Sequence, residues 1–194
     1  MEAHDTAVLA GGGLRVRAQG KTADDYQREF IEAYERHYTK LFAYVYSRVG
    51  NVELAKDLTA EVFEKAYVKG HSVREAAAYT TWLFMIAKNV VIGHYRRQKR
   101  EHNGLARVKD SLWLTERQPD PETGALYGEE VSNLMRHLRK LSGRDQELLA
   151  LKFEGELSYA EISRVLKLSE VNVRVSIFRA LKRLRSLMEA EGDR

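Results

Sequence analysis

The chain has 194 residues, 44% of them hydrophobic and 31% charged, which suits one large domain or two small ones with a sizeable core. It contains 2 prolines and no cysteine, which excludes a disulfide framework, thiol catalysis and thiolate metal sites. Few helix breakers among many helix formers predict an all-α protein. No apolar run approaches ~18 residues and the first residues lack a basic stretch, so we expect no secretory signal, no membrane insertion and a cytoplasmic location.

The net charge of the chain is only +4, but two stretches contain several basic residues and no acidic one. Residues 88–100 contain Lys88, Arg96, Arg97, Lys99 and Arg100 and no acid. Residues 174–185 contain Arg174, Arg179, Lys182, Arg183 and Arg185 and again no acid. Cations at helix C-termini would explain one such run. Two runs, each on an amphipathic helix, favour a nucleic acid as partner.

Four segments follow one another along the chain. Residues 1–23 include a run of three glycines and predict a flexible tail. Residues 24–100 and 127–194 have helical periodicity and predict two small helical domains. Residues 101–126 hold both prolines and predict a flexible linker, which at most spans roughly 85 Å when extended. Such a linker would let the two domains bind separate DNA sites at once.

The second domain contains the pattern of a helix-turn-helix. Ser158 and Glu161 form a predicted capping box, and the short helix that they start ends near Leu166. A second helix follows from Glu170 to about Met188, and in a helix-turn-helix this helix enters the major groove. The residues expected to hold the pair together are Ile162, Val165, Leu166, Leu168, Val173, Ile177 and Leu181. The residues expected to face DNA are Glu170, Asn172, Arg174, Val175, Arg179 and Arg183. An ordinary antiparallel helix pair is the alternative.

The predicted helix from Tyr79 to Arg100 has a core stripe and, on the opposite side, a second face that is not purely polar. Its core stripe is Leu83, Ile86, Ala87 and Val90. The opposite side carries Met85, Lys88, Asn89, Ile92 and Arg96, a mixture of apolar, amide and cationic groups. Such a surface suits unstacked bases beside a phosphate backbone.

The predicted helix from Asn51 to Lys69 also has a second apolar patch. Phe63 and Tyr67 lie off its core stripe, beside the charged Asp57 and Glu61. An apolar patch with a charged rim is typical of a protein-binding surface, and on that interpretation Phe63 would be exposed. A third helix of the same domain that covers the patch would explain it equally well.

Taken in order, these segments resemble the extracytoplasmic-function branch of the bacterial RNA polymerase sigma factors, within the sigma-70 family. The resemblance runs over about 30–100 and 134–188. It is carried by Tyr34-Glu-Arg-His-Tyr38, Glu53-Leu-Ala-Lys-Asp-Leu58, Thr81-Trp-Leu-Phe-Met-Ile-Ala-Lys-Asn89, Tyr95-Arg-Arg-Gln-Lys-Arg100, Leu157-Ser-Tyr-Ala-Glu-Ile162 and Arg179-Ala-Leu-Lys-Arg-Leu-Arg185.

The resemblance implies a site for each segment. Residues 24–100 would be sigma region 2, which docks on the β′ clamp helices of core RNA polymerase and opens the −10 element. The polymerase contacts would be Asp57, Glu61, Phe63 and Tyr67, and the −10 contacts Lys88, Asn89, Ile92, Arg96 and Arg97. Residues 127–194 would be region 4, which reads the −35 element of promoter DNA and meets the β-flap. Such proteins are often held inactive by an anti-sigma factor.

Two other functions remain as alternatives. A free-standing helix-turn-helix regulator would bind duplex as a dimer and would not need the exposed Met85–Arg96 face. A nucleic-acid enzyme would need a catalytic or metal-binding cluster, but the 6 histidines are scattered and form no pair at helical spacing. We therefore expect no catalytic residue, no metal and no cofactor.

Overall fold

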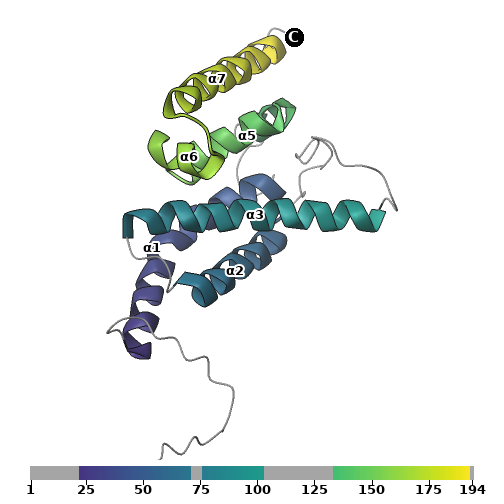
Figure 1. Cartoon of the computed structure of the whole chain (residues 1–194). Coiled ribbons are helices and arrows are strands. Elements are labelled where there is room, and N and C mark those ends of the chain that lie inside the picture. Colours follow the sequence, from purple (N-terminus) through teal and green to yellow (C-terminus); the bar gives the residue numbers. More distant parts are fainter. Residues whose placement is uncertain (1–21, 71–75, 103–132, 193–194) are drawn as a thin grey trace, which may run out of the picture.

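The computed structural model describes residues 22–70, 76–102 and 133–192, and all three segments are helical with short turns between the helices (Figure 1). The predicted all-α fold is confirmed for this part of the chain. Most of the predicted linker and almost all of the predicted tail lie outside the described residues.

The N-terminal unit consists of three helices whose ends follow from local sequence. Helix α1 (Ala23–Val49) starts at a capping box formed by Thr22 and Asp25, so the helix begins within the segment expected to be the tail. Gly50 ends it with φ 67°, a left-handed conformation that glycine adopts without steric cost. Asn51 then caps α2 (Val52–Lys69).

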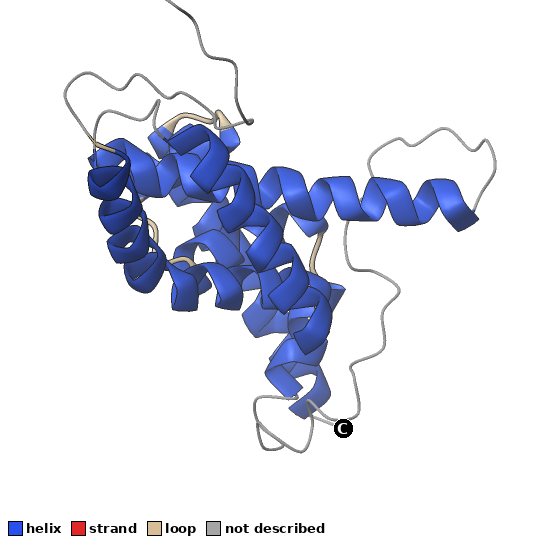
Figure 2. Cartoon of the chain, turned by 90° about the horizontal axis from the view of Figure 1, so that it is seen from below, coloured by secondary structure: helices blue, strands red, loops and turns tan. Residues whose placement is uncertain are grey.

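Helix α3 (Ala76–His102) has 27 residues and is as long as α1. It lies between α2 on one side and the C-terminal helices on the other (Figure 1). Its C-terminal half projects past the other helices, as a second view shows (Figure 2). Arg96, Arg97 and Arg100 on this half are exposed to solvent.

The C-terminal unit is a set of short helices under one long helix. A helix over 133–140 precedes α5 (Gly143–Leu149), whose N-cap is Ser142. The π-helical turn η2 (Ala150–Glu154) continues α5, and its last bond runs from Gly155 N–H to Ala150 C=O at 2.9 Å.

Helices α6 (Tyr159–Leu166) and α7 (Glu170–Gly192) form the predicted helix-turn-helix. The Ser158–Glu161 capping box is present. Lys167 takes the left-handed position of the turn, φ 55°, where glycine is usual. Ile162, Val165, Val173 and Ile177 are buried between the helices. Leu181 is 39% exposed, so its predicted place in this core is wrong; the buried position on that turn of the helix is Ala180.

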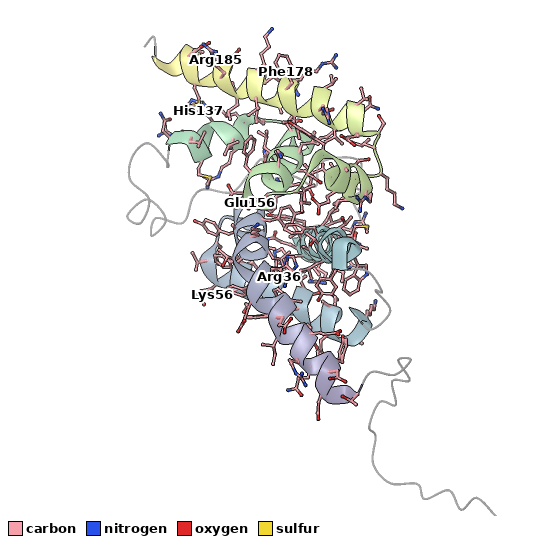
Figure 3. The ribbon with its side chains drawn as sticks, turned by 90° about the vertical axis from the view of Figure 1, so that its left-hand side faces the viewer. Arg36, Lys56, His137, Glu156, Phe178 and Arg185 are labelled. Carbon is pink, nitrogen blue, oxygen red and sulfur yellow. The ribbon has the colours of Figure 1, made fainter. Side chains whose placement is uncertain are left out.

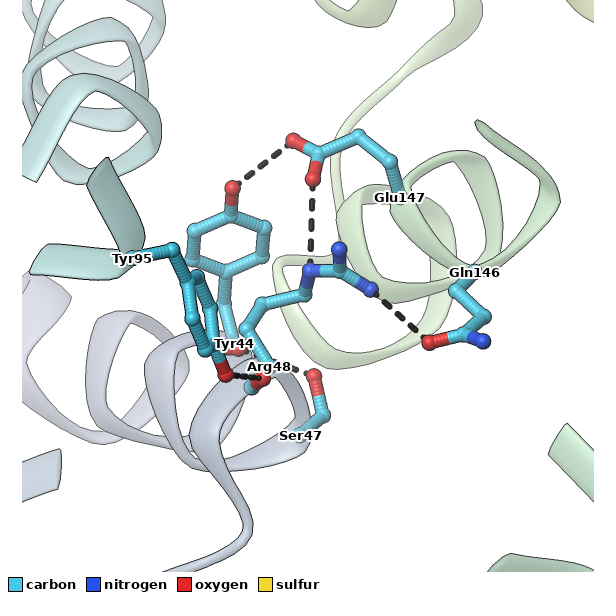
Figure 4. Close-up of polar contacts among 6 residues, drawn as sticks. All are labelled: Tyr44, Ser47, Arg48, Tyr95, Gln146 and Glu147. Carbon is cyan, nitrogen blue, oxygen red and sulfur yellow. Dashed lines mark hydrogen bonds and ion pairs between the residues drawn. The ribbon is translucent and has the colours of Figure 1, made fainter. Parts of the chain in front are cut away.

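The two units pack directly against each other through a buried polar network on α1 and α5 (Figure 4). Arg48 is 1% exposed and its Nε lies 3.3 Å from Oε2 of Glu147, which makes a buried ion pair. The Tyr44 hydroxyl donates to Glu147 Oε1 at 2.8 Å, and Arg48 Nη1 donates to Gln146 at 3.4 Å. Burial, followed by the nearby Glu147 charge, raises the pKa of Tyr44 well above its usual value.

Two further contacts join the units around this network. The ring of Phe84 on α3 is fully buried against Gly155, where an added Cβ would lie 2.8 Å from the ring. At the surface, Lys40 Nζ lies 2.6 Å from Glu156 Oε2. Among the described residues, the interface therefore includes a buried charge pair with hydrogen bonds around it, an aromatic contact and an exposed charge pair.

Candidate nucleic-acid and partner interfaces

The predicted strand-binding face of α3 lies at the surface. Asn89, Arg96 and Arg97 are exposed, and Lys88 and Ile92 are half-buried. Asn89, Ile92 and Arg96 share one side of the helix because they are three and seven residues apart.

Gly93 lies within this face and was not singled out as functional from the sequence. A Cβ built there would meet only Arg97 Nη1, at 3.7 Å. The glycine therefore leaves the helix backbone open to close approach between Asn89 and Arg97. Glycine inside an otherwise regular helix was the available signal.

The expected polymerase-binding face of α2 is only partly at the surface. Asp57 is exposed, Glu61 is half-buried and Tyr67 is 47% exposed. Phe63 is 4% exposed, so the expectation that it lies off the core is wrong. Helix α1 covers it, as the alternative interpretation held.

An aromatic cluster on α1 is what buries Phe63. The Phe63 ring centroid lies 4.6 Å from that of Tyr34 and 6.3 Å from those of Phe30 and Tyr38. Tyr67 lies at the edge of the same cluster, 4.9 Å from Phe30. The aromatic residues of α1 recur every four positions, so their spacing could have revealed a second stripe that must be matched by one on α2.

The α2 and α3 candidate sites meet at one ion pair. Arg97 Nη2 lies 3.6 Å from Oε2 of Glu61, which also pairs with Lys65 on its own helix. Glu61 is thus shared between two cations and is less available to a partner than Asp57. Asp57 remains the exposed carboxylate of the predicted set.

The predicted DNA-binding residues of α7 divide between two sides of the helix. Asn172, Val175, Arg179 and Arg183 line one groove between α7 and the start of α5. The groove also contains Lys140, Arg144, Ser176 and Lys182. None of these four was among the residues predicted to face DNA. Lys140 and Arg144 come from segments before α7, and Lys182 was noted only as part of the second basic run.

Glu170 and Arg174 lie outside this groove. They pair with each other at 2.7 Å, and the Arg174 guanidinium lies 4.9 Å from the ring centroid of Tyr159 on α6. The structure therefore does not bring all six predicted residues together. Four converge on the groove, and two belong to its neighbouring flank.

Arg183 has a structural partner inside the groove. Its Nε and Nη2 donate to the two carboxylate oxygens of Asp145 at 3.0 and 2.6 Å. Asp145 is buried and Arg183 is half exposed, so this bidentate pair holds α7 against α5. Arg179, which is exposed, is the predicted arginine of the groove with no recorded ion pair to a described residue.

The remaining outer face of α7 is partly apolar. Phe178 is 68% exposed and points away from the rest of the protein, and Arg185 lies further along the same helix (Figure 3).

Within the described residues, no three His, Cys, Asp or Glu side chains are grouped so that they could hold a metal ion. No helix in the same part of the chain is long and apolar enough to cross a bilayer.

Comparison with known proteins assigns both units to one family. Residues 33–101 match the model of sigma-70 region 2, and residues 132–184 match that of sigma-70 region 4. The chain is 30% identical to the ECF RNA polymerase sigma factor SigM of Bacillus subtilis, over 80% of this chain and 93% of SigM. It is 31% identical to the RNA polymerase sigma factor YlaC of the same organism, over 83% of this chain and 93% of YlaC.

Two solved structures share the fold. The sigma factor RpoE of Bartonella quintana, in complex with the anti-sigma factor NepR, has a TM-score of 0.62 at 21% identity, over 86% of this chain and 98% of RpoE. CnrH, in complex with the cytosolic domain of CnrY, has a TM-score of 0.59 at 23% identity, over 89% of this chain and 92% of CnrH. With the two region matches and the curated relatives, this shows that the chain belongs to the extracytoplasmic-function sigma factors, which bind core RNA polymerase and promoter DNA.

Proposed function

We propose that this sigma factor divides promoter recognition between the α3 face and the α7 groove. The observation that supports this most is the convergence of Arg179, Lys182, Arg144 and Asn172 on one groove of a helix-turn-helix. Cations along the groove would contact phosphates of the −35 duplex, and Asn172, at the N-terminal end of α7, would reach base edges.

Helix α3 would act on the opened −10 element. Asn89 and Ile92 offer an amide and an apolar group that bases expose only after they unstack. Arg96 and Arg97 would then lie along the backbone of the same strand. Binding of the opened strand in preference to the duplex is what would favour melting.

The acidic side of α2 would dock on the polymerase. Asp57 is exposed, and Tyr67, ten residues further along the same helix, is 47% exposed. The clamp helices of β′ are the partner that the family resemblance implies, and the β-flap is implied for region 4. Phe63 would not touch the polymerase itself, because its ring is buried against α1; it would hold α2 in place.

An anti-sigma factor is a further proposed partner. Both fold neighbours are described in complex with another protein, and for RpoE that protein is an anti-sigma factor. We also infer that the chain works in the cytoplasm, where RNA polymerase and promoters are, and that it performs no catalysis of its own.

Run-off transcription with core polymerase tests whether the chain acts as a sigma factor. The affinity for promoter DNA, measured at several salt concentrations, tests the assignment of the groove. Arg179→Ala should weaken binding to all −35 variants alike and reduce the dependence of affinity on salt. Arg174→Ala is the matched control on the other flank of α7 and should affect DNA binding much less. Equal losses for the two variants would contradict the groove assignment.

The α3 assignment has its own test. An Asn89→Ala, Ile92→Ala protein should still bind core polymerase and form closed complexes, but it should fail to expose thymines to permanganate on duplex promoter. A template with a pre-melted −10 bubble should restore its transcription. Normal melting on duplex promoter would show that this face has no part in opening.

A further inference from the structure

A cavity of about 270 Å³ lies at the junction of the two units. Its wall combines the end of α1, the helix over 133–140, the α5–η2 segment and α7. None of its lining residues belongs to the groove on the other side of α7. The cavity is therefore separate from the surface proposed to bind DNA.

Most of the cavity wall is apolar. Leu149 is buried behind it, and Leu138 and Leu184 are half-buried. Phe153 and Leu181 also line it, although they are 55% and 39% exposed. Apolar side chains that line a cavity and still meet water gain from any occupant that covers them. Concave and mostly apolar sites at the boundary between units are where small molecules commonly bind.

Three charged residues line the cavity, and one of them, Arg48, pairs with Glu147. The other two, Arg139 and Glu154, have opposite signs. The structure records no ion pair between either of these two and another described residue. Burial lowers the pKa of Arg139 and raises the pKa of Glu154, so both charges are held at a cost in solvation. A guanidinium in this position presents a planar set of donors that matches a carboxylate.

We propose that this cavity binds a small amphipathic carboxylate, with its carboxylate on Arg139 and its hydrocarbon tail over Phe153 and Leu181. Size supports this class, since a 150 Å³ apolar cavity holds one benzene and 270 Å³ therefore suits about ten to twelve heavy atoms. Because the wall comes from both units, the bound molecule would stabilise their contact.

The probes are decanoate, decylamine and decanol, each below its micelle concentration, titrated calorimetrically into the full chain. Decanoate should bind more tightly than the other two. Arg139→Gln should weaken decanoate by about ten- to a hundredfold, the effect of losing one hydrogen-bonded charge. Arg144→Gln, an arginine of the separate groove, is the matched control and should leave the affinity unchanged.

Three more variants test the rest of the site. Glu154→Gln should bind decanoate at least as tightly as the parent chain, because it removes a negative charge from the wall. Ala150→Met should fill the cavity and abolish binding of decanoate and decanol, with Leu184→Phe as a second filling variant should the first not fold. Equal affinity of the Arg139 and Arg144 variants, or tighter binding of decylamine, would overturn the proposal.

Discussion

Glu147 is the residue whose loss should change the contact between the two units most. Its carboxylate accepts from the Tyr44 hydroxyl and pairs with Arg48, and both partners lie on α1. Glu147→Ala would leave the Arg48 guanidinium, 1% exposed, without its counter-ion. Removing one member of a buried ion pair costs about 3–5 kcal/mol, because the remaining charge stays desolvated.

The loss of stability caused by Glu147→Ala has an upper limit, which is the free energy of the contact between the two units. If they separate, Arg48 regains its hydration, so the loss of stability cannot exceed the free energy of the contact between the units. Glu147→Ala should therefore lower the free energy of unfolding in urea, increase the radius of gyration in small-angle X-ray scattering, or do both.

Two controls separate charge from contact. Glu156→Ala removes an exposed charge pair between the units. Its partner is Lys40, and the side chains of Glu156 and Lys40 are 61% and 44% exposed. An exposed pair of this kind contributes about 0–1 kcal/mol. An Arg48→Met, Glu147→Leu double variant removes both buried charges and should cost much less than Glu147→Ala alone. A Glu147→Ala protein as compact and as stable as the Glu156→Ala protein would refute this account of the interface.

Three further predictions concern single helices and one titrating group. Phe63→Ala should lower the free energy of unfolding by about 3–5 kcal/mol, the usual cost of deleting a buried Phe, whereas Tyr67→Ala should cost less in the same urea titration; equal losses would show that Phe63 is not core. Ser158→Ala should cost about 1 kcal/mol through loss of the capping box of α6, and an unchanged melting midpoint would contradict this. Burial raises the pKa of Glu154 in the folded state above the ordinary 4.5, because the buried carboxyl is more stable when protonated. The contribution of the protonated carboxyl to folding stability is therefore complete below pH 4.5, and it is lost as the pH rises through the folded-state pKa. Glu154→Gln should therefore stabilise the chain at pH 7 relative to the parent more than at pH 4, and a constant difference between these pH values would contradict the sign.

Local sequence was sufficient for most of the helix ends and for the helix-turn-helix. Caps such as Ser158 with Glu161, and breaks such as Gly50 with Asn51, act through backbone groups only a few residues away. Their outcome therefore does not depend on the rest of the fold. The same holds for the exposed face of Asn89 and Arg96, because helical periodicity alone places them opposite the core stripe.

The fate of Phe63 depended on tertiary structure. A residue off the main stripe of α2 can face solvent or another helix, and spacing within α2 does not distinguish these cases. The ring is buried because α1 presents Phe30, Tyr34 and Tyr38 to it, residues 25 or more positions away in the chain. Such pairing is a property of two helices together.

The groove and the interface between the units were decided by tertiary structure for the same reason. Arg179 and Arg183 have the same charge and lie one turn apart, yet only Arg183 meets Asp145, because α5 packs beside that turn of α7. Likewise the sequence around Arg48 does not predict its counter-ion, Glu147, which lies in the other unit. Composition and periodicity determined the all-α class and most of the helices, because these depend on local backbone chemistry, and the order and spacing of the sequence motifs indicated the family. Which charges are paired and which are left for DNA or another ligand depended on packing between distant segments, because a charge is neutralised by whatever lies beside it in space.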